Sequence, residues 1–111
     1  MELLFKDGLA LHSYPFRIVY TFTDSDKFNL KVAFSVSKRN FKKAVDRNRV
    51  KRLMKESYRT QQQILTNELK ETQKSIQIFF LFISKEINSF SEMNSKMQDA
   101  LLKLKVKLLQ I

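Results

Sequence analysis

The sequence of 111 residues contains no cysteine and no tryptophan, and it has one glycine, one proline and one histidine. Without cysteine the chain can form neither a disulfide nor a thiolate metal site, which is typical of cytoplasmic proteins. One glycine is too few for the loops that cradle nucleotide phosphates, and His12 has no partner in a catalytic-triad or metal-ligand spacing. We therefore expect no catalytic residue, no metal site and no cofactor bound by the protein alone.

Long hydrophobic runs are missing as well. The longest, Ile78 to Ile83, is far too short to span a bilayer, which takes about 20 apolar residues. The first residues, MELLFKDG, lack the basic region and following apolar run of a signal peptide. The sequence therefore predicts a cytoplasmic protein.

Positive charge is what the chain has in excess, with 21 Lys and Arg against 11 Asp and Glu and a formal net charge of +10. Nearly half of these cations lie in one stretch, where only Asp46 and Glu56 are acidic. The cations of this stretch are Lys38, Arg39, Lys42, Lys43, Arg47, Arg49, Lys51, Arg52, Lys55 and Arg59. Such a concentration predicts a polyanionic partner, either nucleic acid or an anionic membrane surface.

The second half of the stretch, residues 44–65, has a helical pattern without Gly or Pro. Its apolar side consists of Val50, Leu53, Met54, Ser57, Tyr58, Ile64 and Leu65. Off that side lies an i, i+4 ladder of Arg47, Lys51, Lys55 and Arg59, widened by Asn48 and Arg52. Like charges at this spacing repel by a few tenths of a kcal/mol per pair, a cost that an anionic partner removes. The alternative is an ordinary solvated face.

Nucleic acid is favoured over a membrane as the partner of this helix. Its apolar side is needed to cover a sheet, and arginine binds phosphate through two parallel hydrogen bonds. Phe5 and Tyr14, near the predicted sheet, could also stack on unpaired bases. The alternative for both aromatic residues is a place in the hydrophobic core, and the sequence leaves that choice open.

Alternating and apolar segments predict three strands. Residues 16–22 and 30–37 alternate, and the polar residues 23–29 between them predict a hairpin connection. Residues 76–83 are almost unbroken apolar, which is typical of a central strand covered on both faces. Small side chains such as Ala33 make the face opposite the core shallow, so this face is either solvent-exposed or a ligand groove.

Helices are expected at both ends of the chain. Residues 1–6 before Gly8 have the pattern of the last turn of a short first helix. Ser89 and Glu92 have the spacing of a capping box, so a C-terminal helix should begin near Phe90. The order of elements predicts a two-layer α+β sandwich, and the length predicts a single domain, 1–111.

The run from Val36 to Glu56 resembles a family signature. It begins with Val36-Ser37-Lys38-Arg39 at a strand end and continues, after a connector, as AVDRNRVKRLMKE. This ungapped run is similar to the V-[SA]-K-[KR] and A-x-x-R-N-R-[IV]-K-R-x-x-[RK]-E signature of the bacterial ribonuclease P protein subunit. The upstream LFKDG, the apolar strand and the Ser-Phe-x-Glu helix start also fit, so the resemblance covers nearly the whole chain.

The resemblance implies an αβββαβα order with a left-handed β-α-β crossover, similar to ribosomal protein S5 domain 2, with a shortened first helix. It also implies a subunit that joins a catalytic RNA and binds the 5′ leader of precursor tRNA. The subunit would assist endonucleolytic removal of the leader, while the RNA and its Mg²⁺ carry out the hydrolysis. The implied partners are the catalytic RNA and precursor tRNA, without a membrane.

The resemblance also implies roles for individual residues. The catalytic-RNA contacts would be Arg47, Asn48, Arg49, Lys51 and Arg52. Electrostatic support would come from Lys38, Arg39, Lys42, Lys43, Lys55 and Arg59. Phe5 would line the leader cleft, with a floor formed by Arg17, Val19, Ala33 and Ser35.

Two other functions remain open on sequence grounds. A general basic RNA- or DNA-binding module would share the cation run, but it would not accelerate leader cleavage by a catalytic RNA at low Mg²⁺. A protein-only nuclease would cleave without an RNA subunit, and it is the weaker alternative because no hydrolytic constellation is visible.

Overall fold

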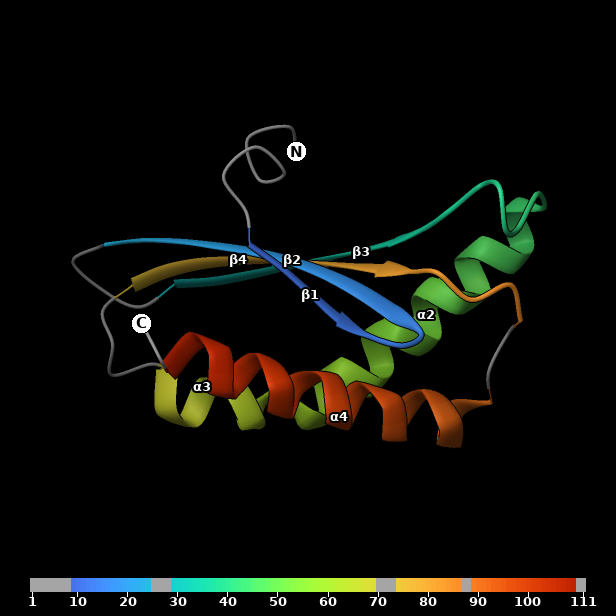
Figure 1. Ribbon diagram of the computed structural model, residues 1–111. Helices are drawn as coiled ribbons and strands as arrows, with labels where there is room; N and C mark the ends of the chain where they lie inside the picture. The colour runs from blue at the N-terminus through green and yellow to red at the C-terminus, as the bar shows by residue number, and fades with distance from the viewer. Residues whose placement is uncertain (1–8, 25–28, 70–73, 87–88, 110–111) are drawn as a thin grey trace.

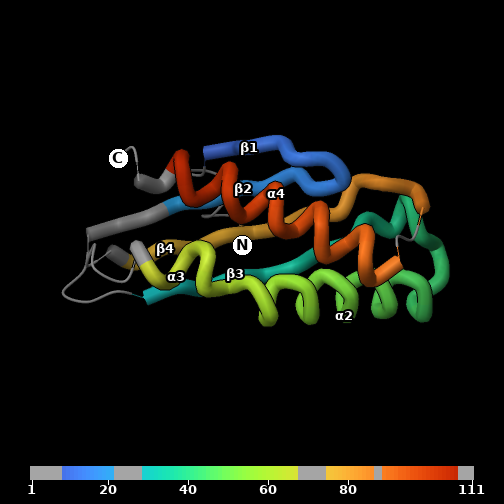
Figure 2. The backbone as a smooth tube through the Cα atoms, turned by 90° about the horizontal axis from the view of Figure 1, so that it is seen from below, coloured from blue at the N-terminus to red at the C-terminus, as the bar shows by residue number. Residues whose placement is uncertain are grey.

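In the computed structural model, residues 9–24, 29–69, 74–86 and 89–109 are described. The elements are β1 (Leu9–Ser13), β2 (Phe16–Asp24), β3 (Asn29–Val36), α2 (Ala44–Gln61), α3 (Gln63–Leu69), β4 (Lys74–Phe82) and α4 (Phe90–Leu109). The strands form one sheet, and the three helices cover one of its faces (Figure 1 and Figure 2). This arrangement confirms the predicted two-layer α+β sandwich. The expected first helix, residues 1–6, lies outside the described residues.

The strand order within the sheet is β1-β2-β4-β3. β2 pairs antiparallel with both β1 and β4, whereas β3 pairs parallel with β4. β4 therefore occupies a central position, as its apolar run predicts. The predicted hairpin over residues 23–29 is wrong, because β4 lies between the two strands that these residues connect. The hairpin instead joins β1 to β2 through Tyr14 and Pro15.

The connection from β3 to β4 runs through α2 and α3 beneath the sheet. In Figure 1 both strands run toward the same end of the sheet, with β3 behind β4, and α2 and α3 return below them. Figure 2, from below, shows the same order of strands. The chain thus passes from β3 along the helices beneath the sheet to β4, which lies nearer the viewer. A β-α-β connection with this course is left-handed. The predicted left-handed crossover is thus present, although right-handed crossovers are the rule.

One face of each strand builds the core against the helices. Fully buried side chains include Phe16 and Ile18 of β2, Phe80 of β4 and Met54 of α2. Aromatic rings form a continuous series in this layer: Phe34 stacks on Phe80 with centroids 5.3 Å apart, and Phe34 also packs on Tyr58 of α2 at 5.8 Å. The alternation predicted for β2 and β3 is thus present, with one face of each strand turned to the core.

The helical segment expected over residues 44–65 is divided in two at Gln62. In the turn before the division, the backbone carbonyl of Ser57 accepts hydrogen bonds from the side chains of Thr60 and Gln61. Side chains that bond to carbonyls in this way compete with the helical backbone pattern and bend helices. The start of α4 is as predicted, since the Ser89 hydroxyl accepts a hydrogen bond from the Glu92 backbone N–H at 3.2 Å.

Candidate nucleic-acid interface

The segment between β3 and α2, residues 37–43, has a defined structure and is called the connector below. The Phe41 N–H donates to the Ser37 carbonyl at 3.2 Å, and the Asn40 side chain donates to the carbonyl of Ile83 at 3.2 Å. Phe41 is buried and packs on Phe82 with ring centroids 6.1 Å apart. The connector is therefore anchored to the sheet and presents its charged residues from a fixed base.

Arg47 ties the first turn of α2 back to this connector. Its Nη1 nitrogen donates to the backbone carbonyls of Phe41 at 2.8 Å and Lys42 at 2.9 Å. A guanidinium carries five N–H groups, so three remain for a phosphate. The sequence predicts Arg47 as an RNA contact, and the structure shows that it also orders the chain that carries the neighbouring cations.

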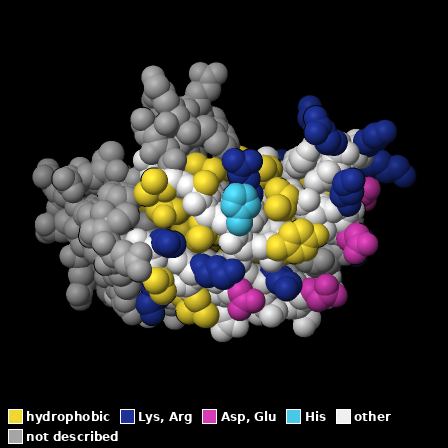
Figure 3. Space-filling view, in the orientation of Figure 1, with side chains coloured by type: hydrophobic (Ala, Val, Ile, Leu, Met, Phe, Trp, Pro, Cys, Tyr) yellow, Lys and Arg dark blue, Asp and Glu magenta, His cyan; other side chains and the backbone are white. Residues whose placement is uncertain are grey.

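The connector cations and the start of α2 form one electropositive region. Exposed side chains in this region are Lys38, Arg39, Lys42, Lys43, Asn48, Arg49, Arg52 and Lys55, and Lys51 is half-buried. Dark blue side chains gather at this end of the molecule (Figure 3), above the start of α2. Lys43 precedes α2 without a side-chain cap, so the N–H groups of the first turn add a positive dipole end there.

The cations of α2 lie on two sides of the helix rather than on a single stripe. Tyr58 packs against Phe34 of β3, and Lys51 lies two turns earlier on the same line of the helix. Lys51 therefore faces the side of edge strand β3, whereas Arg49 and Arg52 point away from it. The helix offers cations over a broad surface, which suits the curved backbone of a folded RNA.

Arg59 differs from the other predicted cations because it has an acidic partner. It forms an ion pair with Glu56 one turn earlier, through its Nε and Nη2 atoms. The hydrogen bond from Arg59 lowers the pKa of the Glu56 carboxyl below its ordinary value, and the same bond raises the pKa of Arg59. The pair is exposed, so it contributes little to stability, but it compensates the charge of Arg59.

The sheet face opposite the helices brings the predicted leader-floor residues together in rows. Arg17 pairs with Leu81, which pairs with Ser35, and Val19 pairs with Phe79, which pairs with Ala33. Phe79 and Leu81 lie in the middle of this face, between the two predicted strands. Sequence reasoning missed them because the almost unbroken apolar run of β4 conceals which residues point to which face. Phe5, also predicted here, lies outside the described residues.

Polar and cationic residues border this small apolar centre. His12 of β1 pairs with Arg17, so both lie on the same face, and both are exposed. On the other side of the centre, Gln77 pairs with Lys31, and both are exposed. β3 then leads directly from this face into the connector, so the two candidate surfaces adjoin. The strand register alone therefore adds His12 and Lys31 to the candidate residues for leader binding.

The described residues contain no group of three His, Cys, Asp or Glu side chains that could hold a metal ion. In the same residues, no helix is both long and apolar enough to cross a membrane.

Comparison with known proteins identifies the family of this chain. The family model described as Ribonuclease P matches residues 2–105. The ribonuclease P protein component of Porphyromonas gingivalis strain W83 is 35% identical over 105 residues, covering 94% of this chain and 77% of the relative. This chain belongs to the ribonuclease P protein family. The protein component of Chlorobaculum tepidum is 37% identical over 70 residues, covering 60% of this chain and 46% of the relative.

Solved ribonuclease P proteins share the fold described above. The protein from Thermotoga maritima matches with a TM-score of 0.68 at 22% identity, covering 92% of this chain and 88% of that protein. The protein from Staphylococcus aureus matches with a TM-score of 0.59 at 21% identity, covering 93% and 85%. The roles of individual residues in RNA contact and leader binding stay predictions.

Proposed function

We propose that this ribonuclease P subunit binds the catalytic RNA and the 5′ leader of precursor tRNA, and that it assists endonucleolytic removal of the leader. The observation that carries the proposal is the anchored connector beside the N-terminus of α2. There the buried Phe41 and the Arg47 hydrogen bonds hold exposed cations in place without neutralising them. Fixed, unpaired cations of this kind suit a phosphate backbone with a definite shape.

The two candidate surfaces would have different tasks. The connector and α2 would neutralise phosphates of the catalytic RNA, which releases condensed counterions and makes binding depend on salt. The adjoining sheet face, with the exposed Arg17 and Lys31 at its border and the partly exposed Ala33 and Leu81 beside the buried Val19 and Phe79, would hold the single-stranded leader. Apolar or aromatic surface for bases beside cations for the backbone is how proteins hold single strands.

Catalysis would reside in the RNA. In the holoenzyme, Mg²⁺ bound by RNA would supply the charge stabilisation for phosphodiester hydrolysis. The protein's cations would strengthen the binding of RNA and substrate, most visibly when Mg²⁺ is scarce. We expect the holoenzyme to act in the cytoplasm.

Salt dependence of RNA binding tests the proposal. The double variant Arg49→Ala with Arg52→Ala removes two exposed cations of α2 that make no side-chain hydrogen bond or ion pair with the described residues. The slope of log affinity against log salt for the catalytic RNA should fall by roughly 0.7–0.9 for each lost phosphate contact. The control, Lys107→Ala, removes one cation from an exposed position near the end of α4, and its slope should change by less than half as much.

A cleavage assay separates this function from a general nucleic-acid-binding module. Precursor tRNA is incubated with catalytic RNA at low Mg²⁺, with and without the protein. We expect faster release of the leader with the protein. If cleavage is no faster than with RNA alone, a general binding module is the better description, and cleavage by the protein alone would point to a nuclease.

A further inference from the structure

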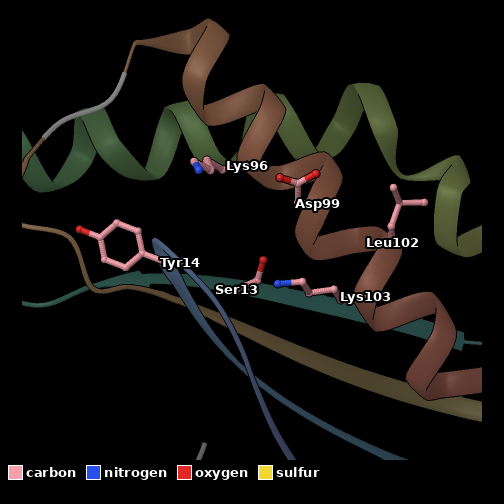
Figure 4. Close-up of a pocket in the computed structure, with 6 residues that line it drawn as sticks. All are labelled: Ser13, Tyr14, Lys96, Asp99, Leu102 and Lys103. Carbon is pink, nitrogen blue, oxygen red and sulfur yellow. The ribbon is translucent and has the colours of Figure 1, made fainter.

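A second surface with the chemistry of a nucleotide site lies between the β1–β2 turn and α4. A pocket of about 440 Å³ is lined there by Ser13, Tyr14, Lys96, Asp99, Leu102 and Lys103. This volume is in the range of small-ligand sites in proteins. Figure 4 shows that the turn residues form one wall and the α4 residues the other. None of these residues except Tyr14 enters the sequence-based site.

The local structure explains why these residues face one another. Lys96, Asp99 and Lys103 follow the i, i+3 and i+7 spacing, so they share one side of α4. The opposite side of α4, including Met97 and Leu101, is fully buried on the sheet. α4 packs along β1, and this places its polar side beside the end of the β1–β2 hairpin.

Tyr14 and Leu102 supply an aromatic and an apolar surface that are open to solvent. Tyr14 is 66% exposed and Leu102 is 44% exposed. The structure thus decides against a place for Tyr14 in the core. A phenol ring held at a turn and left in water provides a platform on which a nucleobase can stack, and such stacking tolerates any base.

The charged groups of the pocket carry a net positive charge and remain unpaired. Asp99 lies between Lys96 and Lys103 on the helix, yet no ion pair within 4.0 Å joins these three residues in the described structure. In Figure 4 the Lys103 amine points toward Ser13, and the Asp99 carboxylate lies on the pocket side of α4. The two ammonium groups can bind phosphate, and the carboxylate can accept a hydrogen bond from a ribose hydroxyl or a base amine.

Hydrogen bonds link this pocket to the connector. The carbonyl of Pro15, next to Tyr14, accepts from the N–H of Ile83 at 2.9 Å. The carbonyl of Ile83 accepts from the side chain of Asn40 in the connector at 3.2 Å. The pocket and the connector therefore belong to the same end of the sheet, on either side of the last residues of β4.

We propose that this pocket binds a nucleotide of single-stranded RNA, so that the RNA-binding surface continues from the connector around this end of the sheet to α4. The base would stack on Tyr14, the adjacent phosphates would each contact Lys96 or Lys103, and Asp99 between these lysines would accept a hydrogen bond from a ribose hydroxyl or a base amine. The nucleotide could come from the catalytic RNA or from precursor tRNA, since the chemistry is the same. The proposal rests on the proposed RNA-binding function.

Photocrosslinking in the assembled complex tests the site and identifies the RNA. The photoreactive residue p-benzoylphenylalanine is placed at position 14, or as a control at position 106, an exposed position of α4 that does not line the pocket. The complex contains catalytic RNA and precursor tRNA with different radioactive labels, so the crosslinked RNA reveals its source. We expect position 14 to crosslink to RNA well above position 106. Equal yields at the two positions would overturn the proposal.

Affinity measurements give an independent result. Tyr14→Ala should weaken binding to the crosslinked RNA by roughly tenfold, and Tyr14→Phe should retain most of the affinity because the ring is kept. Lys96→Ala with Lys103→Ala should lower the salt slope by more than twice the change seen with the single Lys107→Ala control. If the pocket variants bind normally while the Arg49→Ala, Arg52→Ala variant is weakened, the pocket is refuted and the proposed function stands. Failure of the native protein to bind either RNA would refute the proposed function itself.

Discussion

The Nη1 nitrogen of Arg47 lies 2.8 Å from the carbonyl oxygen of Phe41 and 2.9 Å from that of Lys42. One guanidinium nitrogen thus joins the start of α2 to the segment that precedes it. The first arginine of the Arg-Asn-Arg motif is therefore part of the architecture of the interface as well as part of its charge. The exposed Arg49 has no such task, which makes the two arginines experimentally separable.

The first prediction concerns Arg47→Ala, which removes both of these hydrogen bonds. Bonds from a charged donor contribute about 1.5–3 kcal/mol, and less where water can replace them, so we expect local destabilisation of about 1–2 kcal/mol. Amide hydrogen exchange should report this as roughly 5- to 30-fold faster exchange of the Phe41 N–H, which bonds to Ser37. Arg49→Ala removes the same charge and should leave this exchange unchanged. Equal exchange in the two variants would contradict the positioning role.

Phe41 is the anchor of the connector, and its truncation is the second prediction. Its ring is buried against Phe82, so Phe41→Ala should lower the free energy of unfolding by about 3–5 kcal/mol. Val45→Ala is the control, because Val45 is exposed on α2 and its truncation should change stability by less than about 0.5 kcal/mol. Urea unfolding measures both. A small loss for Phe41→Ala would show that the connector is not anchored through this ring.

The sequence predicts the helices and strands of this fold better than it predicts which of them lie side by side. Alternation in β2 and the helix start after Ser89 follow from local patterns, and the structure confirms both. The position of β4 between β2 and β3 depends on a pairing across two helices, which no local turn signal in residues 23–29 can report. The resemblance implied the left-handed crossover, whereas the general physical rule favours the opposite hand.

The site residues show the same difference between local sequence patterns and tertiary contacts. Cations on the connector and α2 are visible as a sequence concentration, but their anchoring by Asn40, Phe41 and Arg47 depends on tertiary contacts. Phe79 and Leu81 become candidates only when the register is known. The α4 pocket joins residues more than 80 positions apart in the sequence, so periodicity shows each helix side but not what it faces.

The third prediction uses the phenol of Tyr58. Burial against Phe34 and Phe80 raises its pKa to about 12 from the ordinary value of 10.0, because the ionised form is poorly solvated there. The unfolded chain releases this proton at lower pH than the folded chain. The stabilisation is therefore present below pH 10 and is lost as the pH rises from about 10 toward 12.

Tyr58→Phe removes this titration. For each protein, the free energy of unfolding at neutral pH is the reference for the values at higher pH. A shift of about two pKa units corresponds to roughly 2–3 kcal/mol. The native protein should therefore lose about that much more stability than the variant between pH 8 and pH 12, as measured by urea unfolding at each pH. The other alkaline groups titrate in both proteins and cancel in the difference. Parallel stability curves for the two proteins would contradict the burial of this group.

The last prediction tests the sheet face opposite the helices as the leader-binding surface. Ser35 lies in the row with Leu81 and Arg17, close to the small apolar centre. Ser35→Glu places a negative charge where a leader phosphate would pass, at a cost of roughly 1 kcal/mol, the repulsion of two unit charges about 4 Å apart when water screens them. Affinity for precursor tRNA should fall about fivefold, whereas affinity for the same tRNA without a leader should stay unchanged.

Ser91→Glu is the matched control for this variant, because it adds the same charge at an exposed position of α4, away from the face. It should leave the ratio of the two tRNA affinities unchanged. An equal loss of affinity for both tRNAs in Ser35→Glu would mean that the added charge acts on general RNA binding. An unchanged ratio with unchanged affinities would place the leader somewhere other than this face. Only a selective loss for the leader-bearing tRNA assigns the leader to the surface formed by β2, β4 and β3.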